Sequence, residues 1–341
     1  MIKSITRGTL LKLIPVLTLT LSLISCNKDS DEEYNYMTGT LSMDLPTYII
    51  AGETLNLSVS GITSPTEGIT YKWTTPSFSA DSVFGQTVEI IAPVTIGTYT
   101  VQVIARHDDY VSSTQSRATT VLNYDEGGSF EGLTKGANFI TDSRDGKKYY
   151  YNKIGNLDWF TQNLNWAGTG HPYLDADAIS YAYGRLYTWN EATGGVTAAG
   201  LGTGVKGICP QGWSVPTNED WQDLAKSLNG GIALPFDSYW TGIGSKVTLQ
   251  AYMNSISMWK YSPENLQQNM YNWTALPGGN AQSEYTRYRY MREYGFWWSG
   301  TQKDADNAFF RYIYFDSGDF PYSFTSKNDF AASVRCVRLS Y

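Results

Sequence analysis

The segment from Cys209 to Leu224 constrains the fold of its surroundings more than any other stretch of the chain. Pro216 ends an extended run, and Thr217 is placed to cap a helix together with Asp220, three residues later. Apolar residues then recur at helical spacing over 221–228, until an Asn-Gly-Gly run stops the pattern. The sequence therefore predicts one amphipathic helix that begins after Pro216.

Cys209, at the head of that segment, has a candidate partner in Cys336, which lies near the end of a strand predicted over 332–339. A bond between them would close a loop of 336 minus 209, or 127, residues. The chain-entropy model assigns such a loop at most ~5 kcal/mol of stabilisation. Two free thiols are the alternative, and only the bond would tie the second half of the chain into one unit.

The composition is that of a globular protein. The chain has 341 residues, of which 42% are hydrophobic, 17% charged and 15% aromatic, and this length suits two domains with cores of their own. The formal net charge is -7, and no predicted element carries a cluster of Lys and Arg. A nucleic-acid partner is therefore not expected, and the acidity favours solubility.

The N-terminus has the features of a targeting segment. Three basic residues precede an apolar run over 13–24, which is too short to span a bilayer comfortably. The run ends in Ser25-Cys26, which resembles the lipobox of bacterial lipoproteins, where cleavage falls before the cysteine and its thiol is lipidated. We therefore expect residues 1–25 to be a signal peptide and Cys26 to carry lipid, so that the protein contacts a membrane through this anchor only. An ordinary signal peptide with a chance cysteine is the alternative.

The stretch 26–37 is predicted to be an acidic tether. Its run 27–33 resembles the export signal that sends some Bacteroides-type lipoproteins to the outer face of the outer membrane. We accordingly expect a lipid-anchored protein of the outer membrane, exposed at the cell surface. The alternative is that the acidic run is only a solvated linker, which leaves the periplasmic face of that membrane open. Once Cys26 is lipidated, Cys209 and Cys336 remain as a pair in an oxidising compartment, which favours the disulfide.

Residues 38–123 alternate between short apolar strands and turn residues, a pattern typical of an all-β antiparallel sandwich. The strands are predicted over 54–59, 70–73, 87–91, 98–104 and 118–122. Trp73 and the run Gly97-Thr98-Tyr99 resemble those of polycystic-kidney-disease-type (PKD-type) Ig-like domains of bacterial surface proteins. The resemblance implies a spacer domain in which Trp73 anchors the core.

A Gly-rich hinge opens a linker over 124–137, and a second domain is predicted over 138–341. This domain begins with a hairpin of two strands, 139–144 and 147–154. The Asp145-Gly146 pair between them is a signal for a type I′ turn.

The remainder of the second domain is predicted to combine helices, loops and closing strands. A first helix is predicted over 178–193, before the helix that follows Pro216. No long period holds over 234–293, so this span is expected to form loops, where binding sites are often placed. The closing strands are expected over 295–301, 308–315 and 332–339.

Several short motifs of the second half occur in a characteristic order. They are Asp145-Gly146, Tyr183-Gly184-Arg185, Cys209-Pro210-Gln211-Gly212-Trp213, Trp297-Trp298-Ser299-Gly300 and Ser333-Val334-Arg335-Cys336. The ordered set, over residues 138–340, resembles the Fibrobacter succinogenes major paralogous domain family. That family is similar to the C-type-lectin-like fold and, more distantly, to the formylglycine-generating enzyme group. The resemblance implies an α+β domain with two helices on a twisted, mostly antiparallel sheet, and it implies no established reaction.

The residues that carry most enzymatic chemistry are sparse. His107 and His171 are the only histidines and lie in different predicted domains, so neither a Ser-His-Asp unit nor a His-based metal cluster is expected. A formylglycine-generating activity needs a reactive cysteine pair, and Cys209 and Cys336 are better explained as a structural bridge. No catalytic residue is predicted, because the carboxylates of the loop-rich half show no spacing that singles out an acid and a nucleophile.

No cofactor is expected, with calcium as the alternative. Lectin-like folds often hold Ca²⁺ with Asp, Asn and loop carbonyl oxygens. The Glu-Pro-Asn and Gln-Pro-Asp tripeptides of calcium-dependent lectins are absent, and Pro263-Glu264-Asn265 has a different order. The sequence therefore names no metal ligand.

Aromatic and basic residues near the end of the loop-rich span are the best ligand-binding candidates. They are Tyr285, Arg287, Tyr288, Arg289 and Tyr290, followed by Trp297 and Trp298. Tyrosine faces and arginine forks suit stacking on, and hydrogen bonding to, sugars or polar polymers. A packed strand with a solvated basic edge is the alternative. In a strand, one of the two adjacent tryptophans is expected to point outwards, where it could serve as a platform or simply cover the sheet.

Together these patterns predict a surface lipoprotein in which an Ig-like spacer carries a lectin-like module. Its expected partner is a glycan or a surface or extracellular protein. A non-catalytic structural subunit of a surface assembly is the main alternative, and an enzyme on the formylglycine-generating-enzyme-like fold is a weaker one.

Overall fold

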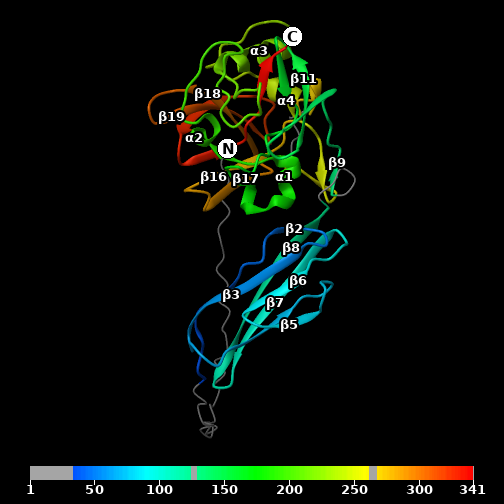
Figure 1. Cartoon of the computed structure of the whole chain (residues 1–341), viewed down its shortest axis with the longest axis vertical. Helices are drawn as coiled ribbons and strands as arrows, with labels where there is room; N and C mark the ends of the chain where they lie inside the picture. The colour runs from blue at the N-terminus through cyan, green and yellow to red at the C-terminus, as the bar shows by residue number, and fades with distance from the viewer. Residues whose placement is uncertain (1–33, 124–128, 261–266, 341) are drawn as a thin grey trace, which may run out of the picture.

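Alternating apolar residues give most N-terminal strands one buried face, and the strands pack as two sheets. The computed structural model describes residues 34–123, 129–260 and 267–340, and these sheets form the lower of its two β-rich bodies in Figure 1. The strands are β1 (Thr38–Met43), β2 (Tyr48–Ile50), β3 (Thr54–Ser64), β4 (Thr70–Thr74), β5 (Ser82–Phe84), β6 (Thr87–Ile91), β7 (Gly97–His107) and β8 (Tyr110–Leu122). The sheet orders are β1-β3-β6 and β2-β8-β7-β4-β5.

The core of this sandwich lies between the two sheets. Leu57 of β3 and Val103 of β7 meet there, and Trp73 of β4 is fully buried, as expected for a core anchor. The strands pair antiparallel except for β2 and β8, which are parallel. The expectation of a wholly antiparallel sandwich is therefore wrong at this edge, because β2 enters the sheet beside β8 in the same direction.

The C-terminal body combines three sheets with short helices. Its strands are β9 (Phe130–Glu131), β10 (Asn138–Thr141), β11 (Lys148–Ile154), β12 (Leu157–Phe160), β13 (Tyr187–Thr188), β14 (Tyr252–Met253), β15 (Ile256–Ser257), β16 (Gly278–Gln282), β17 (Arg287–Met291), β18 (Tyr294–Gln302), β19 (Asn307–Tyr314), β20 (Tyr322–Ser326), β21 (Phe330–Ala332) and β22 (Val337–Leu339). Its helices are η1 (Tyr173–Asp175), α1 (Asp177–Tyr183), α2 (Trp189–Thr193), α3 (Asn218–Leu228), α4 (Ile243–Val247) and η2 (Met270–Asn272). The sheet orders are β10-β11-β12-β22, β15-β14-β9 and β13-β21-β16-β18-β19-β20 with β17 on β16, and the pairs are antiparallel except β16 with β18.

The helix predicted after Pro216 is α3, and it begins with the predicted cap formed by Thr217 and Asp220. The Asp220 backbone N–H donates to Thr217 Oγ1 (3.2 Å), and the Thr217 N–H donates back to Asp220 Oδ2 (2.9 Å), which completes a capping box. Burial raises the pKa of Asp220 to about 6, although backbone N–H groups donate to it. Trp221 and Leu224 are fully buried on the inner face. This prediction is confirmed.

The single helix predicted over 178–193 is wrong, because the chain forms α1 and α2 with β13 between them. Gly184 ends α1 with a φ of 71°, and a Cβ there would lie 2.7 Å from the Cβ of Asn163. Thr188 then starts α2 through a second capping box, with Glu191. Because the apolar residues keep helical spacing across Gly184, the sequence pattern could not reveal the break. In the described part of the C-terminal body, α3 is accompanied by three short α-helices, α1, α2 and α4, where the resemblance implied two helices in all.

The predicted hairpin forms between β10 and β11, but its turn differs from the type I′ prediction. The loop is closed by the Asp142 N–H to the Lys147 carbonyl and by the Gly146 N–H to the Asp142 carbonyl, both 2.8 Å. Gly146 has a φ of 74°, whereas a type I′ turn would also need a positive φ at Asp145. Asp142 Oδ1 accepts the Arg144 N–H, which favours the longer turn.

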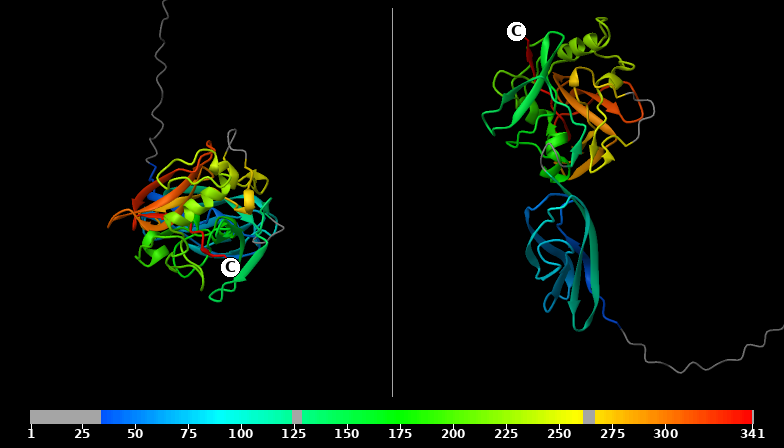
Figure 2. Two further views of the ribbon diagram at one scale, coloured as in Figure 1. Left: turned by 90° about the horizontal axis from the view of Figure 1, so that it is seen from above. Right: turned by 90° about the vertical axis from the view of Figure 1, so that its right-hand side faces the viewer.

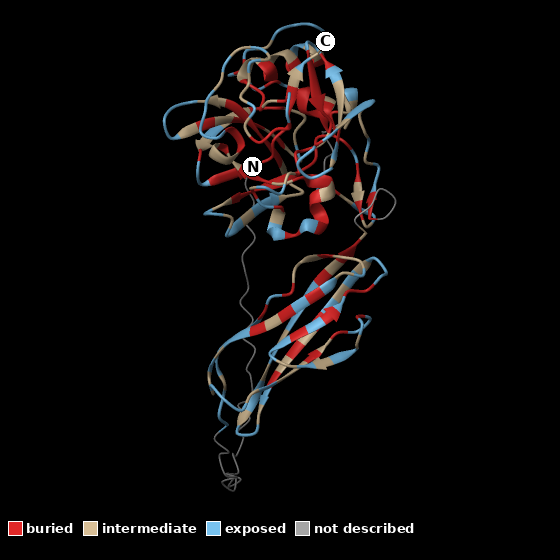
Figure 3. Ribbon diagram, viewed as in Figure 1, coloured by how far each residue is buried: buried red, intermediate tan, exposed pale blue. Residues whose placement is uncertain are grey.

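The disulfide between Cys209 and Cys336 is present, with both residues fully buried and their Cα atoms 5.8 Å apart. It lies in a cluster that includes Phe160, Trp189 and Trp298. Figure 3 shows buried residues concentrated in the interior of the C-terminal body. The predicted strand over 332–339 is interrupted beside the disulfide and forms β21 and β22 instead.

The two bodies lie end to end (Figure 2) and meet through α1. Ile179 of α1 shares an apolar cluster with Leu122 at the end of β8, and Tyr48 of β2 packs against that cluster. Figure 1 shows α1 on the side of the C-terminal body that faces β2. Asn254 Nδ2 also donates to the carbonyl of Val121 (3.2 Å). Apolar and polar contacts therefore both connect the bodies.

Part of the predicted linker joins the C-terminal body, since β9 pairs with β14. The rest of its Gly-rich hinge, residues 124–128, lies outside the described residues, as do the predicted signal peptide, Cys26 and the tether up to residue 33. The predicted domain limits stay predictions. Within the described part of the chain, no helix has the length and apolar character needed to cross a membrane.

Candidate functional site

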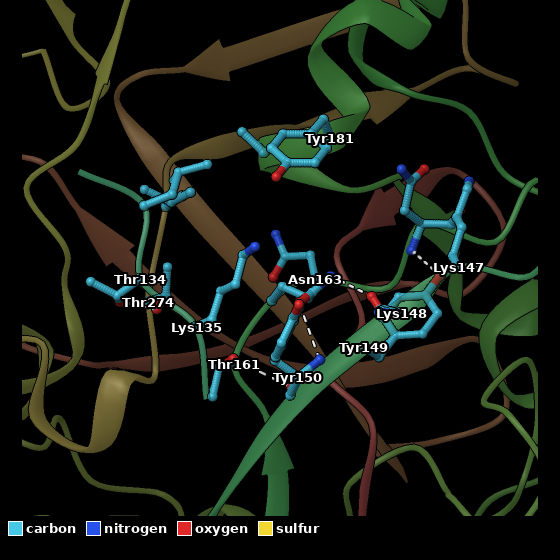
Figure 4. A pocket seen from close by; sticks show the side chains of 15 residues that line it. Thr134, Lys135, Lys147, Lys148, Tyr149, Tyr150, Thr161, Asn163, Tyr181 and Thr274 are labelled. Atoms are coloured by element: carbon cyan, nitrogen blue, oxygen red, sulfur yellow. Dashed lines mark hydrogen bonds between the residues drawn. The ribbon is translucent and has the colours of Figure 1, made fainter. Parts of the chain in front are cut away.

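A cavity of about 290 Å³ opens beside β11. It is lined by residues within 133–135, 147–150, 161–165 and 181–182, and by Thr274 and Leu276. Figure 4 shows these side chains arranged around a shared space. Because α1, β11 and the ends of several loops meet here, segments far apart in sequence build one pocket, which is called the β11 pocket below.

One side of the β11 pocket is a cation held against an aromatic ring. Lys135 Nζ lies 5.0 Å from the centroid of the Tyr150 ring, which is within range of a cation–π contact. Tyr181 lies across the space from them in Figure 4. Tyr150 is half-buried and alternates along β11 with Tyr149, which is fully buried. The pocket therefore offers aromatic surface beside a positive charge.

A second lysine lies at another side of the β11 pocket. Lys147 Nζ donates to the backbone carbonyl of Asn165 and lies 3.8 Å from Asp145 Oδ2. Burial lowers the pKa of Lys147, and Asp145 partly offsets that shift. Asp142, in the same turn, is paired with Arg144 Nη2 at 2.6 Å. Among the described residues that line the pocket, none is Asp or Glu.

Asn163 fixes the floor of the β11 pocket through four hydrogen bonds. Its Nδ2 donates to the Tyr183 carbonyl (2.8 Å) and to Ser333 Oγ (3.1 Å). Its Oδ1 accepts from Trp297 Nε1 (2.9 Å) and from Arg335 Nε (2.7 Å). Since the donors and acceptors of this amide are committed to the protein, Asn163 positions the floor rather than binding a ligand.

Arg335 supports that floor from the core. It is 1% exposed and donates to the carbonyls of Phe160 (3.3 Å), Thr274 (2.6 Å) and Trp273, as well as to Asn163. Its guanidinium carbon lies 4.2 Å from the Trp273 ring centroid. These described partners include no carboxylate, and burial lowers the pKa of Arg335 well below its ordinary value. One buried side chain thus ties together three segments around the β11 pocket.

The tyrosines and arginines predicted to bind a ligand lie elsewhere, on the β16–β17 hairpin. The Tyr285 hydroxyl accepts the Thr188 N–H (3.2 Å) and donates to Glu191, so it braces the start of α2. Its ring centroid lies 4.2 Å from that of His171. Burial and the Glu191 carboxylate raise the pKa of Tyr285 above its ordinary value. These contacts give Tyr285 a structural role.

The other hairpin candidates are more accessible. The Tyr288 ring packs 5.3 Å from the ring of Tyr173, and Tyr288 is half-buried. Arg287, Arg289 and Tyr290 are exposed on β17. None of the five hairpin candidates lines the β11 pocket. A ligand role for the accessible members stays a prediction.

The expectation that Trp297 or Trp298 points outwards is wrong, because both are fully buried. Trp298 joins the cluster around the disulfide, and its Nε1 donates to the Tyr187 carbonyl (2.7 Å). Trp297 points to the opposite face of β18, into a second cluster with Trp221 of α3. Alternation along the strand holds, but both faces of β18 are covered, so neither ring forms a platform.

Sequence reasoning missed the residues that build the β11 pocket. Among the described residues of the span 234–293, where contacts were expected, only Thr274 and Leu276 line the pocket. The run of two lysines and three tyrosines over 147–151 was a visible signal in the hairpin. Nothing local indicated that Lys135 and Tyr181 would join them, because that depends on how the segments pack.

The described residues form no cluster of carboxylates that could bind calcium. No group of three or more His, Cys, Asp or Glu side chains there is close enough to hold a metal ion. No ligand set for calcium can therefore be named.

A comparison with models of protein families identifies the family of the chain. The model of the Fibrobacter succinogenes major domain matches residues 153–338, which is more than half of the 341 residues. The chain belongs to this family. The matched Fibrobacter succinogenes major domain includes Asn163, Arg335 and both disulfide cysteines, whereas Lys135 and Tyr150 precede it. No curated protein matches the chain.

Proposed function

We propose that this protein is a non-catalytic binding module displayed at the cell surface. A C-type-lectin-like domain, carried on an Ig-like spacer and anchored in the outer membrane by lipid on Cys26, binds a glycan or a surface or extracellular protein. The observation that carries the proposal is the β11 pocket, whose aromatic and lysine side chains surround a concave space. Such sites combine apolar walls with a few polar groups that orient a ligand.

The architecture supports each half of this proposal. Two facing sheets with a buried Trp73 are compatible with an Ig-like spacer. Short helices around mostly antiparallel sheets, closed by the Cys209–Cys336 bond, are compatible with a lectin-like module. The lectin-like and Ig-like assignments rest on these features and on the motif resemblance.

The alternatives have less support. A subunit that assembles by strand addition needs an exposed, long edge strand. In the described C-terminal sheets, the longest edge strands are β10, β17 and β20, which have only four, five and five residues. A glycoside hydrolase would need a pair of converging carboxylates, and the described lining residues of the β11 pocket include no Asp or Glu.

A glycan array tests the proposal and locates the site. We expect the chain from Asn27 onwards to bind at least one glycan, and Tyr150→Ala to weaken that binding about tenfold, because it removes the ring that lines the pocket. Tyr288→Ala on the hairpin is the matched control and should bind like the parent chain. If Tyr288→Ala or Arg289→Ala weakens binding and Tyr150→Ala does not, the site is the hairpin.

The anchor is tested separately. We expect Cys26→Ala to leave the protein unlipidated and to release it from the membrane fraction, because a lipid chain is proposed to hold it there. Cell fractionation and mass spectrometry of the N-terminal peptide measure this. A variant that stays firmly in the membrane fraction would contradict the lipobox assignment.

A further inference from the structure

The β11 pocket differs in charge from the protein as a whole. The chain has a formal net charge of -7, yet Lys135, Lys147 and Lys148 line the pocket, and its described lining has no carboxylate. A concave site lined by one sign of charge focuses its field on whatever enters. The pocket therefore favours an anion over a neutral molecule.

Lys135 and Lys147 are held in place by different parts of the pocket. Lys135 Nζ lies over the Tyr150 ring. Lys147 Nζ is bonded to the Asn165 carbonyl and lies 3.8 Å from Asp145 Oδ2, a carboxylate that does not line the pocket. An ammonium group has three N–H donors, so a lysine that makes such contacts can still donate to a ligand. Because protein contacts already restrict these side chains, binding a ligand costs less conformational entropy.

The remaining walls suit a ring rather than a bare ion. Tyr150 and Tyr181 supply aromatic surface, and Leu133 and Leu276 supply apolar surface. A cavity of about 290 Å³ is at the small end of ligand pockets, so it fits the end or a short branch of a larger molecule.

From these contacts we infer that the β11 pocket takes a carboxylate-bearing saccharide, such as a uronic acid or sialic acid unit at the end of a glycan. This inference rests on the proposed function, because it names the chemistry of the same ligand. Lys135 and Lys147 pair with the carboxylate, while Tyr150 packs against the sugar ring. A phosphorylated sugar would also attract the lysines, but its greater charge is costlier to place between apolar walls.

The test uses the chain from Asn27 onwards, which retains every residue that the structure describes, on an array of matched glycans. Each acidic glycan is printed as its carboxylate and as the neutral alcohol made by carboxyl reduction, beside phosphorylated glycans. We expect binding to carboxylate forms that disappears on reduction. Lys135→Ala and Lys147→Ala should each weaken it about tenfold, since each removes a charge-assisted hydrogen bond.

Two further variants control for folding and net charge. Lys153→Ala removes an exposed lysine of β11 that does not line the pocket, and it should bind like the parent chain. Lys135→Gln keeps a long polar side chain without the charge and should also lose about tenfold. Equal losses for Lys153→Ala and Lys135→Ala would overturn the inference, because net charge alone would then explain the effect.

The remaining outcomes separate this inference from the proposed function. Equal binding of carboxylate and reduced forms, with loss in Tyr150→Ala, would overturn the inference and leave the proposed function standing. A preference for phosphorylated glycans would overturn the carboxylate assignment. No binding to any glycan, by a chain with native tryptophan fluorescence, would count against the inference and against the glycan form of the proposed function.

Discussion

Replacing Arg335 with Met should lower the unfolding free energy of the C-terminal body by about 4 kcal/mol. The substitution keeps much of the side-chain volume but leaves Asn163 Oδ1 and the carbonyls of Phe160, Trp273 and Thr274 without this donor. A buried acceptor that loses its partner costs about 1–3 kcal/mol. Part of that loss is offset because the substitution also removes from the core a guanidinium group that has no carboxylate partner. The loss dominates because several acceptors depend on one side chain.

Urea unfolding followed by tryptophan fluorescence measures this effect. Ten of the eleven tryptophans, all but Trp73, follow residue 150, so the signal reports on the C-terminal body. Arg289→Met is the matched control, since Arg289 is exposed on β17. Its loss should stay below about 1 kcal/mol, as for most surface substitutions. Similar losses for both variants would contradict the role assigned to Arg335.

Removing the disulfide should have an effect of similar size. The double variant Cys209→Ala with Cys336→Ala frees a loop of 127 residues in the unfolded chain. The chain-entropy model gives an upper limit of ~5 kcal/mol for this loop. We expect a loss of about 3–5 kcal/mol for the C-terminal body, with the midpoint of the N-terminal sandwich unchanged. Urea unfolding with and without reductant measures the loss.

Reductant provides the internal control for the disulfide. It should destabilise the parent chain to the level of the double variant and leave the double variant unchanged. Non-reducing peptide mapping of protein from its native compartment should recover Cys209 linked to Cys336. Free thiols at both positions, or a double variant as stable as the oxidised parent, would show that the bond does not hold this body together.

The features that sequence reasoning predicted well are local. The helix α3 follows from Thr217 and Asp220, three residues apart, and from apolar spacing over the next turns. The β10–β11 hairpin follows from two strands around one Asp-Gly pair. In each case the residues that decide the structure lie within a few positions of one another, so their effect can be read without the rest of the fold.

The features that sequence reasoning missed depend on packing between distant segments. Gly184 breaks a helical pattern because the chain there passes close to Asn163. Trp297 and Trp298 alternate as expected, but whether a strand face meets solvent is decided by what covers it. The β11 pocket brings Lys135 close to Tyr150 and Tyr181, and no local sequence pattern predicts that these residues line one pocket.

The position of the β11 pocket beside the junction has a mechanical consequence. Lys135 lines the pocket, only 13 positions after Leu122 ends the last strand of the sandwich (135 minus 122). If a ligand held in the pocket pulls against the proposed lipid anchor on Cys26, tension passes from the sandwich to the pocket wall through the α1 contact and the covalent chain. The loop closed by Cys209 and Cys336 also meets this path, since its Asn254 donates to the Val121 carbonyl and its Thr274 and Leu276 line the pocket. The junction and this loop therefore share the load, and the disulfide limits how far the loop can extend when the junction is pulled.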